Sequence, residues 1–285
     1  MREGMMTQTF RVTWAMAALL VCLTWRPAGA GSQPVVGQTT QAESGMVLIP
    51  AGEFTMGSDK SDPAPPKGFV MLKPRFLDER PAHKVNVPAF WIDAYEVTNG
   101  QYIEFVQAAK RATPPFWENG RYPSGTADQP VTQIKWADAR EYCQRNGKRL
   151  PTEAEWEKAA RGMDGREFPW GNEFDAKKAN TGLSTQRGLV PVGSFAAGKS
   201  PYGVYDLAGN VWEWVEDWYQ PYPGSTYTSD YFGERMKVIR GGGWEGTHHD
   251  SSHQYRAAYR FFAPPDLPLG DVGFRCAKDA HPSKK

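Results

Sequence analysis

The sequence predicts an α+β fold with little regular secondary structure. The 285 residues include 29 glycines and 23 prolines, and this excess favours turns and loops over long helices. Aromatic residues make up 13% of the chain, with 11 tryptophans, so the loops can still enclose a packed core. Helix start signals and short apolar strands occur before Pro169, whereas almost no helical period follows it.

Residues 1–30 read as an export signal. Two arginines precede an uncharged apolar run over 12–25, and Ala28-Gly29-Ala30 is a cleavage pattern. The run is short for a hydrocarbon core of about 30 Å, which argues against a membrane span. We therefore expect cleavage near Ala30-Gly31 and a periplasmic or secreted mature protein. A retained anchor and a lipoprotein, attached through Cys22, are the alternatives.

The rest of the chain predicts a single domain. Residues 31–43 are polar and aperiodic and predict a flexible linker, residues 44–279 form the domain, and residues 280–285 are a tail. No other stretch is long and apolar enough to span a membrane. Lys and Arg number 33 against 32 Asp and Glu, and this balance argues against a nucleic-acid partner, since phosphate binding needs a basic surface.

The first half of the domain contains the clearest elements. Two helices begin with capping boxes, Thr98 to Gln101 and Thr152 to Glu155, in which the first and fourth residues cap each other's backbone amides. They should extend to about Lys110 and to Gly162, with a third helix over 136–146 between them. The expected strands are 46–50, 85–87 and 90–92, with a glycine-rich turn at Gly52 and Gly57 and an exposed, proline-interrupted loop over 61–73.

Several segments of the domain carry long and specific motifs. They are MVLIPAGEFTMGS (46–58), ERPAHKVNVPAFWIDAYEVTNGQYIEF (79–105), PVTQIKWADAREYCQRNGKRLPTEAEWEKAARG (130–162), FPWGNE (168–173), YGVYDLAGNVWEWVEDWY (202–219), VIRGGGW (238–244), YRAAYR (255–260) and GFRCA (273–277). Together they resemble the sulfatase-modifying factors, or formylglycine-generating enzymes, over roughly residues 44–279. The resemblance implies an atypical C-type-lectin-like fold of the α+β class, which agrees with the composition.

The cysteines bear on both stability and chemistry. Removal of the signal peptide deletes Cys22 and leaves Cys143 and Cys276 in an oxidising compartment, where pairing is favoured. Two buried free thiols are the alternative. The resemblance implies the pairing, because family members with the same helix motif and the same GFRC ending join these two positions by a disulfide.

The defining site of the family is missing at its expected place. The resemblance implies oxidation of a substrate cysteine with copper held by two cysteines, between an Arg-Gly-Gly-Ser strand and a Tyr-Arg motif. Soft thiolates suit copper(I), so that chemistry needs the pair. The corresponding stretch over 244–254, WEGTHHDSSHQ, contains no cysteine. A copper-thiolate site is therefore absent, which argues against the formylglycine-generating reaction.

The same stretch concentrates other candidate groups. His248, His249 and His253 could hold zinc, iron(II) or copper(II) together with nearby carboxylates, and a solvated polar loop is the alternative. Iron-dependent sulfoxide synthases of this fold carry their histidine motif in a separate helical domain, which this chain lacks. Cysteine-free periplasmic members oxidise a siderophore chromophore. If that role applies, Glu245 is the acid/base candidate by its position.

A structural calcium ion is implied by the resemblance at the Trp-Glu-Trp strand. The ligands carried over are the side chains of Asp206 and Glu213 and the carbonyls of Gly209 and Val211, a set of oxygens that suits a hard cation. A salt bridge between Glu213 and an arginine of a neighbouring motif is the alternative. A second family site would begin at Asn180, but its acidic partner is missing.

Three functional hypotheses follow from these observations. The first is an exported oxidase or oxygenase of divergent chemistry, acting on an unidentified protein, peptide or small molecule. The second is a non-catalytic lectin-like binding or accessory module, whose loop over 244–254 contacts a partner. The third is a formylglycine-generating sulfatase maturase, which the missing cysteine pair disfavours. The fold alone does not decide between them.

Overall fold

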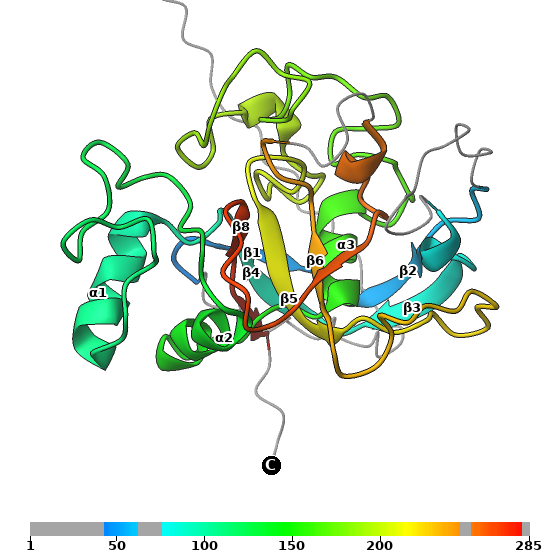
Figure 1. Cartoon of the computed structure of the whole chain (residues 1–285). Helices are drawn as coiled ribbons and strands as arrows, with labels where there is room; N and C mark the ends of the chain where they lie inside the picture. Colours follow the sequence, from blue (N-terminus) through cyan, green and yellow to red (C-terminus); the bar gives the residue numbers. More distant parts are fainter. Residues whose placement is uncertain (1–42, 62–75, 246–251, 281–285) are drawn as a thin grey trace, which may run out of the picture. The chain divides into compact units, whose positions relative to one another are not determined.

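Three sheets and three α-helices make up the described part of the chain, residues 43–61, 76–245 and 252–280 of a computed structural model (Figure 1). The predicted signal peptide and linker, most of the proline-interrupted loop, the tail beyond Ala280, and both His248 and His249 lie outside these residues. Among the described residues, no helix has the length and apolarity that crossing a membrane requires.

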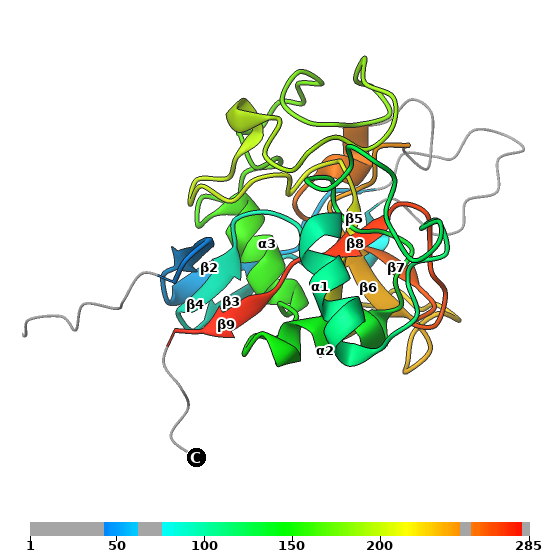
Figure 2. The same ribbon diagram turned by 90° about the vertical axis from the view of Figure 1, so that its left-hand side faces the viewer.

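The first sheet joins the two ends of the domain. Its order is β1 (Met46–Ile49), β4 (Phe90–Asp93) and β9 (Ala277–Asp279), with antiparallel pairing throughout. The central strand pairs Ile92 with Val47 on one side and with Ala277 on the other. Figure 2 shows β9 at the edge of this sheet, close to where the chain ends.

A second sheet lies where the sequence predicted a turn. β2 (Gly52–Met56) pairs with β3 (His83–Val87). Of the two expected turn glycines, Gly52 is the first residue of β2 and Gly57 follows its last residue. The expectation was wrong because Phe54 and Met56 alternate with polar residues and are buried, so the segment has a strand period. Its glycines therefore mark the ends of the strand.

The third sheet carries the candidate site at one edge. Its order is β7 (Phe261–Ala263), β6 (Lys237–Arg240), β5 (Trp212–Trp218) and β8 (Val272–Phe274). β5 runs parallel to β8 and antiparallel to β6, which itself runs antiparallel to β7. The chain therefore leaves β6 at the same edge where β5, β7 and β8 begin.

The three predicted helices are confirmed. They are α1 (Asn99–Ala109), α2 (Trp136–Arg145) and α3 (Glu153–Arg161), and both capping boxes are formed as the sequence indicates. Short 3-10 turns occur at Leu77–Glu79, Ala196–Gly198 and Ser252–Tyr255. α3 contacts β2, β3, β5 and β6, so it packs between two of the sheets (Figure 1).

Packing α3 in the interior buries its charged residues. Glu153 accepts hydrogen bonds from Arg240 (2.8 Å) and from Arg260 (2.7 Å), and Glu157 accepts from Arg240 at 2.7 Å. Burial alone would raise the pKa of Glu153, but the guanidinium groups of Arg260 and Arg240 hold this pKa below its ordinary value. Paired charges of this kind tie α3 to β6 and to the segment before β7.

A covalent link fixes α2 to the end of the domain. The sulfur atoms of Cys143 in α2 and Cys276 between β8 and β9 are joined, with 5.6 Å between the two Cα atoms. Both residues are fully buried in the core under α1 and α2. The bond spans a sequence separation of 133 residues.

Candidate functional site

The segment after β6 lies at the edge of the sheet where β5 and β8 begin. The amide of Trp244 donates to the carbonyl of Asn210 (3.0 Å), and the amide of Trp212 donates to the carbonyl of Asp271 (2.9 Å). These two bonds hold the start of the 244–254 stretch beside the first residue before β8. The structure thus brings a residue that the sequence did not single out, Asp271, to the predicted site.

The carboxylate of Asp271 occupies the space above Gly243. A Cβ atom built on Gly243 would lie 2.4 Å from Oδ2 of Asp271 and 3.1 Å from Cδ1 of Trp212. Only a residue without a side chain leaves room for the carboxylate in this position. Burial and the charge of Glu245 raise the pKa of Asp271 to about 6.

Glu245 and Asp271 therefore form a carboxyl pair at this edge. Glu245 is exposed, while Asp271 is only partly exposed, so the two groups have different environments. Its burial lets Asp271 hold a proton up to a higher pH than an exposed aspartate does. No local sequence pattern indicates Asp271, because its closeness to Gly243 depends on the pairing of β5 with β8.

His253 has a packed ring. It is 9% exposed, and its ring centroid lies 5.2 Å from that of Tyr259 and 6.5 Å from that of Phe76, both in edge-on contact. The described residues contain no group of three or more His, Cys, Asp or Glu side chains arranged to hold a metal ion. A single imidazole does not make a transition-metal site, so these residues do not establish the histidine site that the sequence predicted.

An aromatic cluster supports the other side of the segment. The hydroxyl of Tyr255 accepts from the amide of Gly182 (2.9 Å) and donates to the carbonyl of Gly243 (3.3 Å). Its ring stacks on Phe174 at 5.9 Å. Tyr255 thereby holds the backbone carbonyl of Gly243, the residue over which Asp271 lies.

Glu213 and Asp206, the two side chains expected to bind calcium, differ in the hydrogen bonds that they accept. Both oxygens of Glu213 are occupied: Arg275 donates at 2.7 and 2.8 Å, and the indole of Trp156 donates at 2.9 Å. The structure thus contains the salt bridge that the sequence left open as the alternative for Glu213. Asp206 lies nearby with a left-handed backbone (φ 57°), and its Oδ2 accepts from the amide of Gly193 at 2.6 Å.

A second carboxylate, Glu96, lies beside Asp206. Its Oε1 accepts from the side-chain amide of Asn210 (3.1 Å), and a side-chain hydrogen bond links Glu96 to Asp206. Burial and the neighbouring charge of Asp206 raise the pKa of Glu96 well above its usual range. Sequence reasoning missed Glu96 because it lies more than a hundred residues before the Trp-Glu-Trp strand.

The turn between Asp206 and β5 requires glycine at one place. A Cβ atom on Gly209 would lie 2.3 Å from the carbonyl oxygen of Asn180, and the φ angle of Gly209 is 86°. This close approach brings Asn180 against the turn. The side-chain amide of Asn180 donates to Asn210 Oδ1 (3.1 Å), while its own Oδ1 has no partner among the described residues.

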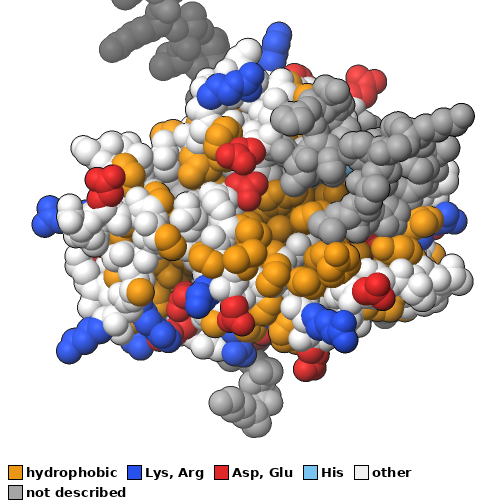
Figure 3. Space-filling view, in the orientation of Figure 1, with side chains coloured by type: hydrophobic (Ala, Val, Ile, Leu, Met, Phe, Trp, Pro, Cys, Tyr) orange, Lys and Arg blue, Asp and Glu red, His pale blue; other side chains and the backbone are white. Residues whose placement is uncertain are grey.

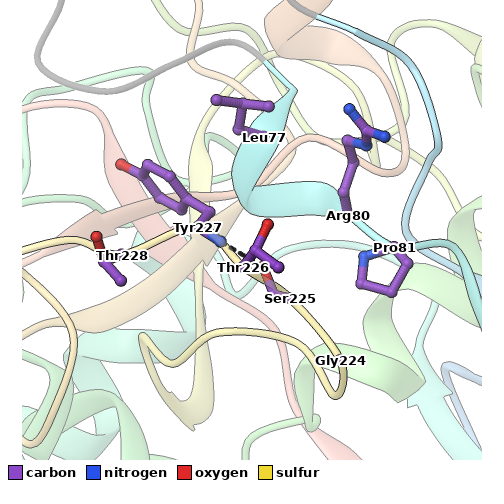
Figure 4. Close-up of a pocket in the computed structure, with 8 residues that line it drawn as sticks. All are labelled: Leu77, Arg80, Pro81, Gly224, Ser225, Thr226, Tyr227 and Thr228. Carbon is purple, nitrogen blue, oxygen red and sulfur yellow. Dashed lines mark hydrogen bonds between the residues drawn. The ribbon is translucent and has the colours of Figure 1, made fainter.

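Two cavities lie away from these groups. The first, of about 520 Å³, is formed by Leu77, Arg80 and Pro81 on one side and the loop over 224–228 on the other (Figure 4). Figure 4 shows the hydroxyl groups of this loop near Leu77, with the amide of Tyr227 donating to Ser225 Oγ at 3.3 Å. Among the predicted site residues that the structure describes, none lines this cavity.

The second cavity, of about 560 Å³, opens at the start of α3. Burial and the charge of Glu153 raise the pKa of Asp217 to about 6, and its Oδ2 accepts from the amide of Glu153 (2.7 Å). The ammonium of Lys237 lies 3.8 and 3.9 Å from the ring centroids of Trp136 and Trp218. These charged groups already have partners within the fold, so we interpret them as structural.

Comparison with known proteins places the chain in a family. Residues 32–280 match the model of the sulfatase-modifying factor enzyme 1-like domain. The chain is 34% identical over 296 positions to the formylglycine-generating enzyme of Bos taurus, covering 84% of this chain and 75% of that protein. It is 33% identical over 264 positions to hercynine oxygenase of Mycolicibacterium smegmatis, covering 76% of this chain and 56% of that protein.

Solved structures agree with the sequence comparison. PvdO from Pseudomonas aeruginosa aligns with a TM-score of 0.60 and 31% identity, covering 82% of this chain and 94% of that one. The fold expected from the sequence, α+β with a C-type-lectin-like arrangement and little regular structure, is confirmed by this likeness and by the elements described above. The chain belongs to the sulfatase-modifying factor, or formylglycine-generating enzyme, family.

Proposed function

We propose that this protein is an exported enzyme of the oxidase or oxygenase type that takes dioxygen as its oxidant and uses a carboxyl pair as its acid and base groups. The observation that carries the proposal is the position of Asp271 over Gly243, with Glu245 beside it, at the sheet edge that precedes the motif of Tyr255. A relative named as an oxygenase supports the reaction class. The signal-like N-terminus supports export.

The cysteine inventory argues against the formylglycine-generating reaction. The chain has three cysteines, of which Cys143 and Cys276 are bonded to each other and Cys22 lies in the predicted signal peptide. No thiol pair is then left for copper(I) in the mature chain. We therefore propose a different reaction on the same scaffold.

The carboxyl pair supplies acid and base groups. With a pKa near 6, Asp271 is largely ionised at pH 7 yet basic enough to take a proton from a bound substrate. Glu245 is exposed to solvent, and its charge acts on Asp271. The histidines of the same stretch would supply imidazole ligands for a transition metal, but only His253 is among the described residues, so we assign no step to them.

A binding or accessory module is the second candidate. Figure 3 shows hydrophobic side chains gathered across the middle of one face, with charged side chains spread around them. Exposed apolar surface of this kind is compatible with a partner protein. In this alternative, the carboxyl pair contacts the partner instead of transferring a proton.

We also propose a structural calcium ion near Asp206. A buried oxygen without a partner supports it, since Asn180 Oδ1 lies in this region without a donor among the described residues. Oxygen ligands suit calcium. The ion would neutralise buried carboxylates and hold the turn before β5, and it would take no part in the reaction.

Metal analysis of the purified mature protein tests the proposal. The wild type is compared with a variant in which His248, His249 and His253 are changed to Ala, each protein after dialysis against metal-free buffer. One transition-metal ion per chain that the variant loses supports the enzyme. Calcium as the only bound metal, together with a partner whose capture is weakened by Asp271→Asn, would favour the binding module.

A second assay separates out the family reaction. A peptide that carries the cysteine motif of sulfatases is incubated with the protein, dioxygen and copper, and the aldehyde is measured by mass spectrometry. We expect no turnover above that of a heat-treated sample. Efficient aldehyde formation would overturn the argument from the missing thiols.

A further inference from the structure

The cavity beside Arg80 contains a positive charge that no described residue balances. It has a volume of about 520 Å³ and lies between Leu77 and the loop over 224–228 (Figure 4). Among the described residues that line it, Arg80 alone is charged. Within the described part of the chain, no carboxylate or carbonyl oxygen accepts a hydrogen bond from its guanidinium. The cavity is therefore a place where a negative charge would be stabilised.

The two acidic residues just before Arg80 are buried and bound elsewhere. Asp78 Oδ2 accepts from the hydroxyl of Tyr219 (2.8 Å), and Glu79 Oε1 accepts from the guanidinium of Arg256. These carboxylates are 1% and 0% exposed, whereas Arg80 is partly exposed. Their proximity in the sequence therefore does not neutralise the charge of Arg80.

The loop on the other side of the cavity supplies hydroxyl groups. Ser225, Thr226 and Thr228 line the cavity, and both threonines are exposed. Ser225 Oγ accepts from the amide of Tyr227 (3.3 Å), which leaves the hydrogen of the Ser225 hydroxyl available to a ligand. Among the described residues, no group pairs with the hydroxyls of Thr226 and Thr228. One guanidinium and three hydroxyls in one cavity form a set of donors that suits an oxyanion.

Contacts with the core hold both sides of the cavity in place. A Cβ atom on Gly224 would lie 3.8 Å from Pro81 Cγ, so the loop packs against the segment that carries Arg80. Tyr222, just before the loop, is 6% exposed, and its ring meets that of His83 edge-on with 4.8 Å between the centroids. Donors that are already held in place lose little conformational freedom when a ligand binds.

We propose that this cavity binds a small organic anion. Its carboxylate or phosphate group lies at Arg80 and the hydroxyls, and its apolar part lies against Leu77 and the ring of Tyr227. The planar guanidinium of arginine matches both kinds of anionic group, and the volume is in the range of small-molecule sites. The site is separate from the carboxyl pair of Asp271 and Glu245, so it does not depend on the proposed reaction.

Titration of the mature protein with four probes tests this site. Benzoate and phenyl phosphate combine a ring with the two kinds of anionic group, inorganic phosphate lacks the ring, and benzamide is a neutral counterpart of benzoate. Dissociation constants are measured at low salt by nuclear magnetic resonance of the probe. We expect the better of the two aromatic anions to bind more tightly than inorganic phosphate and at least tenfold more tightly than benzamide. Its identity shows whether the site takes carboxylates or phosphates.

Two variants locate the binding. Arg80→Gln removes the charge and should weaken binding of the better anion at least tenfold, with little effect on benzamide. Thr226→Val keeps the shape of the side chain, removes one hydroxyl and should weaken the same anion severalfold. Arg121→Gln is the matched control, because Arg121 is exposed and does not line the cavity. Thermal unfolding of each variant shows whether it is folded at the temperature of the titration.

Several results would overturn the proposal. One is a wild type that binds neither aromatic anion, and another is benzamide binding as tightly as the anions, which would leave a cavity without a preference for charge. A folded Arg80→Gln variant with wild-type affinity would place the anion elsewhere. Equal losses in Arg80→Gln and Arg121→Gln would assign the effect to the net charge of the protein and not to this cavity.

Discussion

At the scale of single residues, the candidate site depends on what Gly243 lacks. The family motif that this segment resembles has serine at this position, whereas this chain has glycine. The Oδ2 atom of Asp271 lies 2.4 Å from the position that a Cβ atom on Gly243 would take. The two residues are more than twenty positions apart in the sequence, yet the carboxylate of Asp271 can take its position only because residue 243 is a glycine. The chain thus has a carboxylate where a serine-bearing strand would present a hydroxyl.

The raised pKa of Asp271 makes a prediction about stability. A carboxyl whose pKa is about 6 in the folded protein, against 3.8 for an unperturbed Asp, stabilises the fold only while it is protonated. That contribution is complete below about pH 4 and is lost as the pH rises through 6. Asp271→Asn should therefore match the wild type near pH 4 and exceed it at pH 8 by up to about 3 kcal/mol.

Urea unfolding of both proteins across this pH range measures the effect. Asp266→Asn is the control, because Asp266 is exposed in the same segment and should follow the wild type at every pH. A difference between Asp271→Asn and the wild type that stays constant from pH 4 to pH 8 would show that the carboxyl titrates normally. The same variant should lose activity if Asp271 is the base, so stability and function should change in opposite directions.

At the scale of elements, α3 shows which parts of the fold can be predicted from sequence. Its capping box and the glycine after it are local signals, and the helix has the predicted bounds within one residue. Its charged residues gave no such signal: Glu153 and Glu157 are buried because arginines from β6 and from the segment before β7 meet them. Contacts between residues so far apart in the sequence depend on the sheet topology, which local sequence patterns do not specify.

The same distinction explains the two main differences from expectation. β2 was missed because Gly52 and Gly57 resemble turn residues, although the alternation of Phe54 and Met56 is a strand signal. Glu96 was missed at the candidate calcium site because nothing in its own segment indicates a buried carboxylate. Sequence motifs identified the Trp-Glu-Trp strand and the 244–254 stretch. Which charged residues surround these segments could be determined only from the folded structure.

The capping box of α3 has a measurable contribution. Thr152 Oγ1 accepts from the amide of Glu155 (3.2 Å), and Glu155 accepts in return from the amide of Thr152 (2.8 Å). Thr152→Ala should lower the free energy of unfolding by about 1 kcal/mol, as loss of a cap hydroxyl does in other helices. Thr152→Ser keeps the hydroxyl and should lose much less. Equal losses in the two variants, measured by urea unfolding, would assign the effect to the methyl group and not to the cap.

At the scale of the whole domain, the chain is closed by contacts between its ends. β4 pairs with β1 near the start of the domain and with β9 at its end, and the disulfide joins α2 to the segment before β9. Pairings this distant in sequence must overcome a large loss of chain entropy when they form. A cross-link that shortens the distance in the unfolded chain therefore stabilises the whole domain and not one helix.

The disulfide gives the last prediction. A bond across 133 residues restricts the unfolded chain by about 5 kcal/mol in the entropy model, and removal of native disulfides typically costs about 2–5 kcal/mol. Changing both Cys143 and Cys276 to Ala should lower the unfolding free energy by an amount in this range, and so should reduction of the wild type. The two treatments share the lost bond, but only the substitution removes buried sulfur atoms, so reduction should cost less. If the reduced wild type unfolds at the same urea concentration as the oxidised protein, then the strand pairings of β4 alone hold the two ends together.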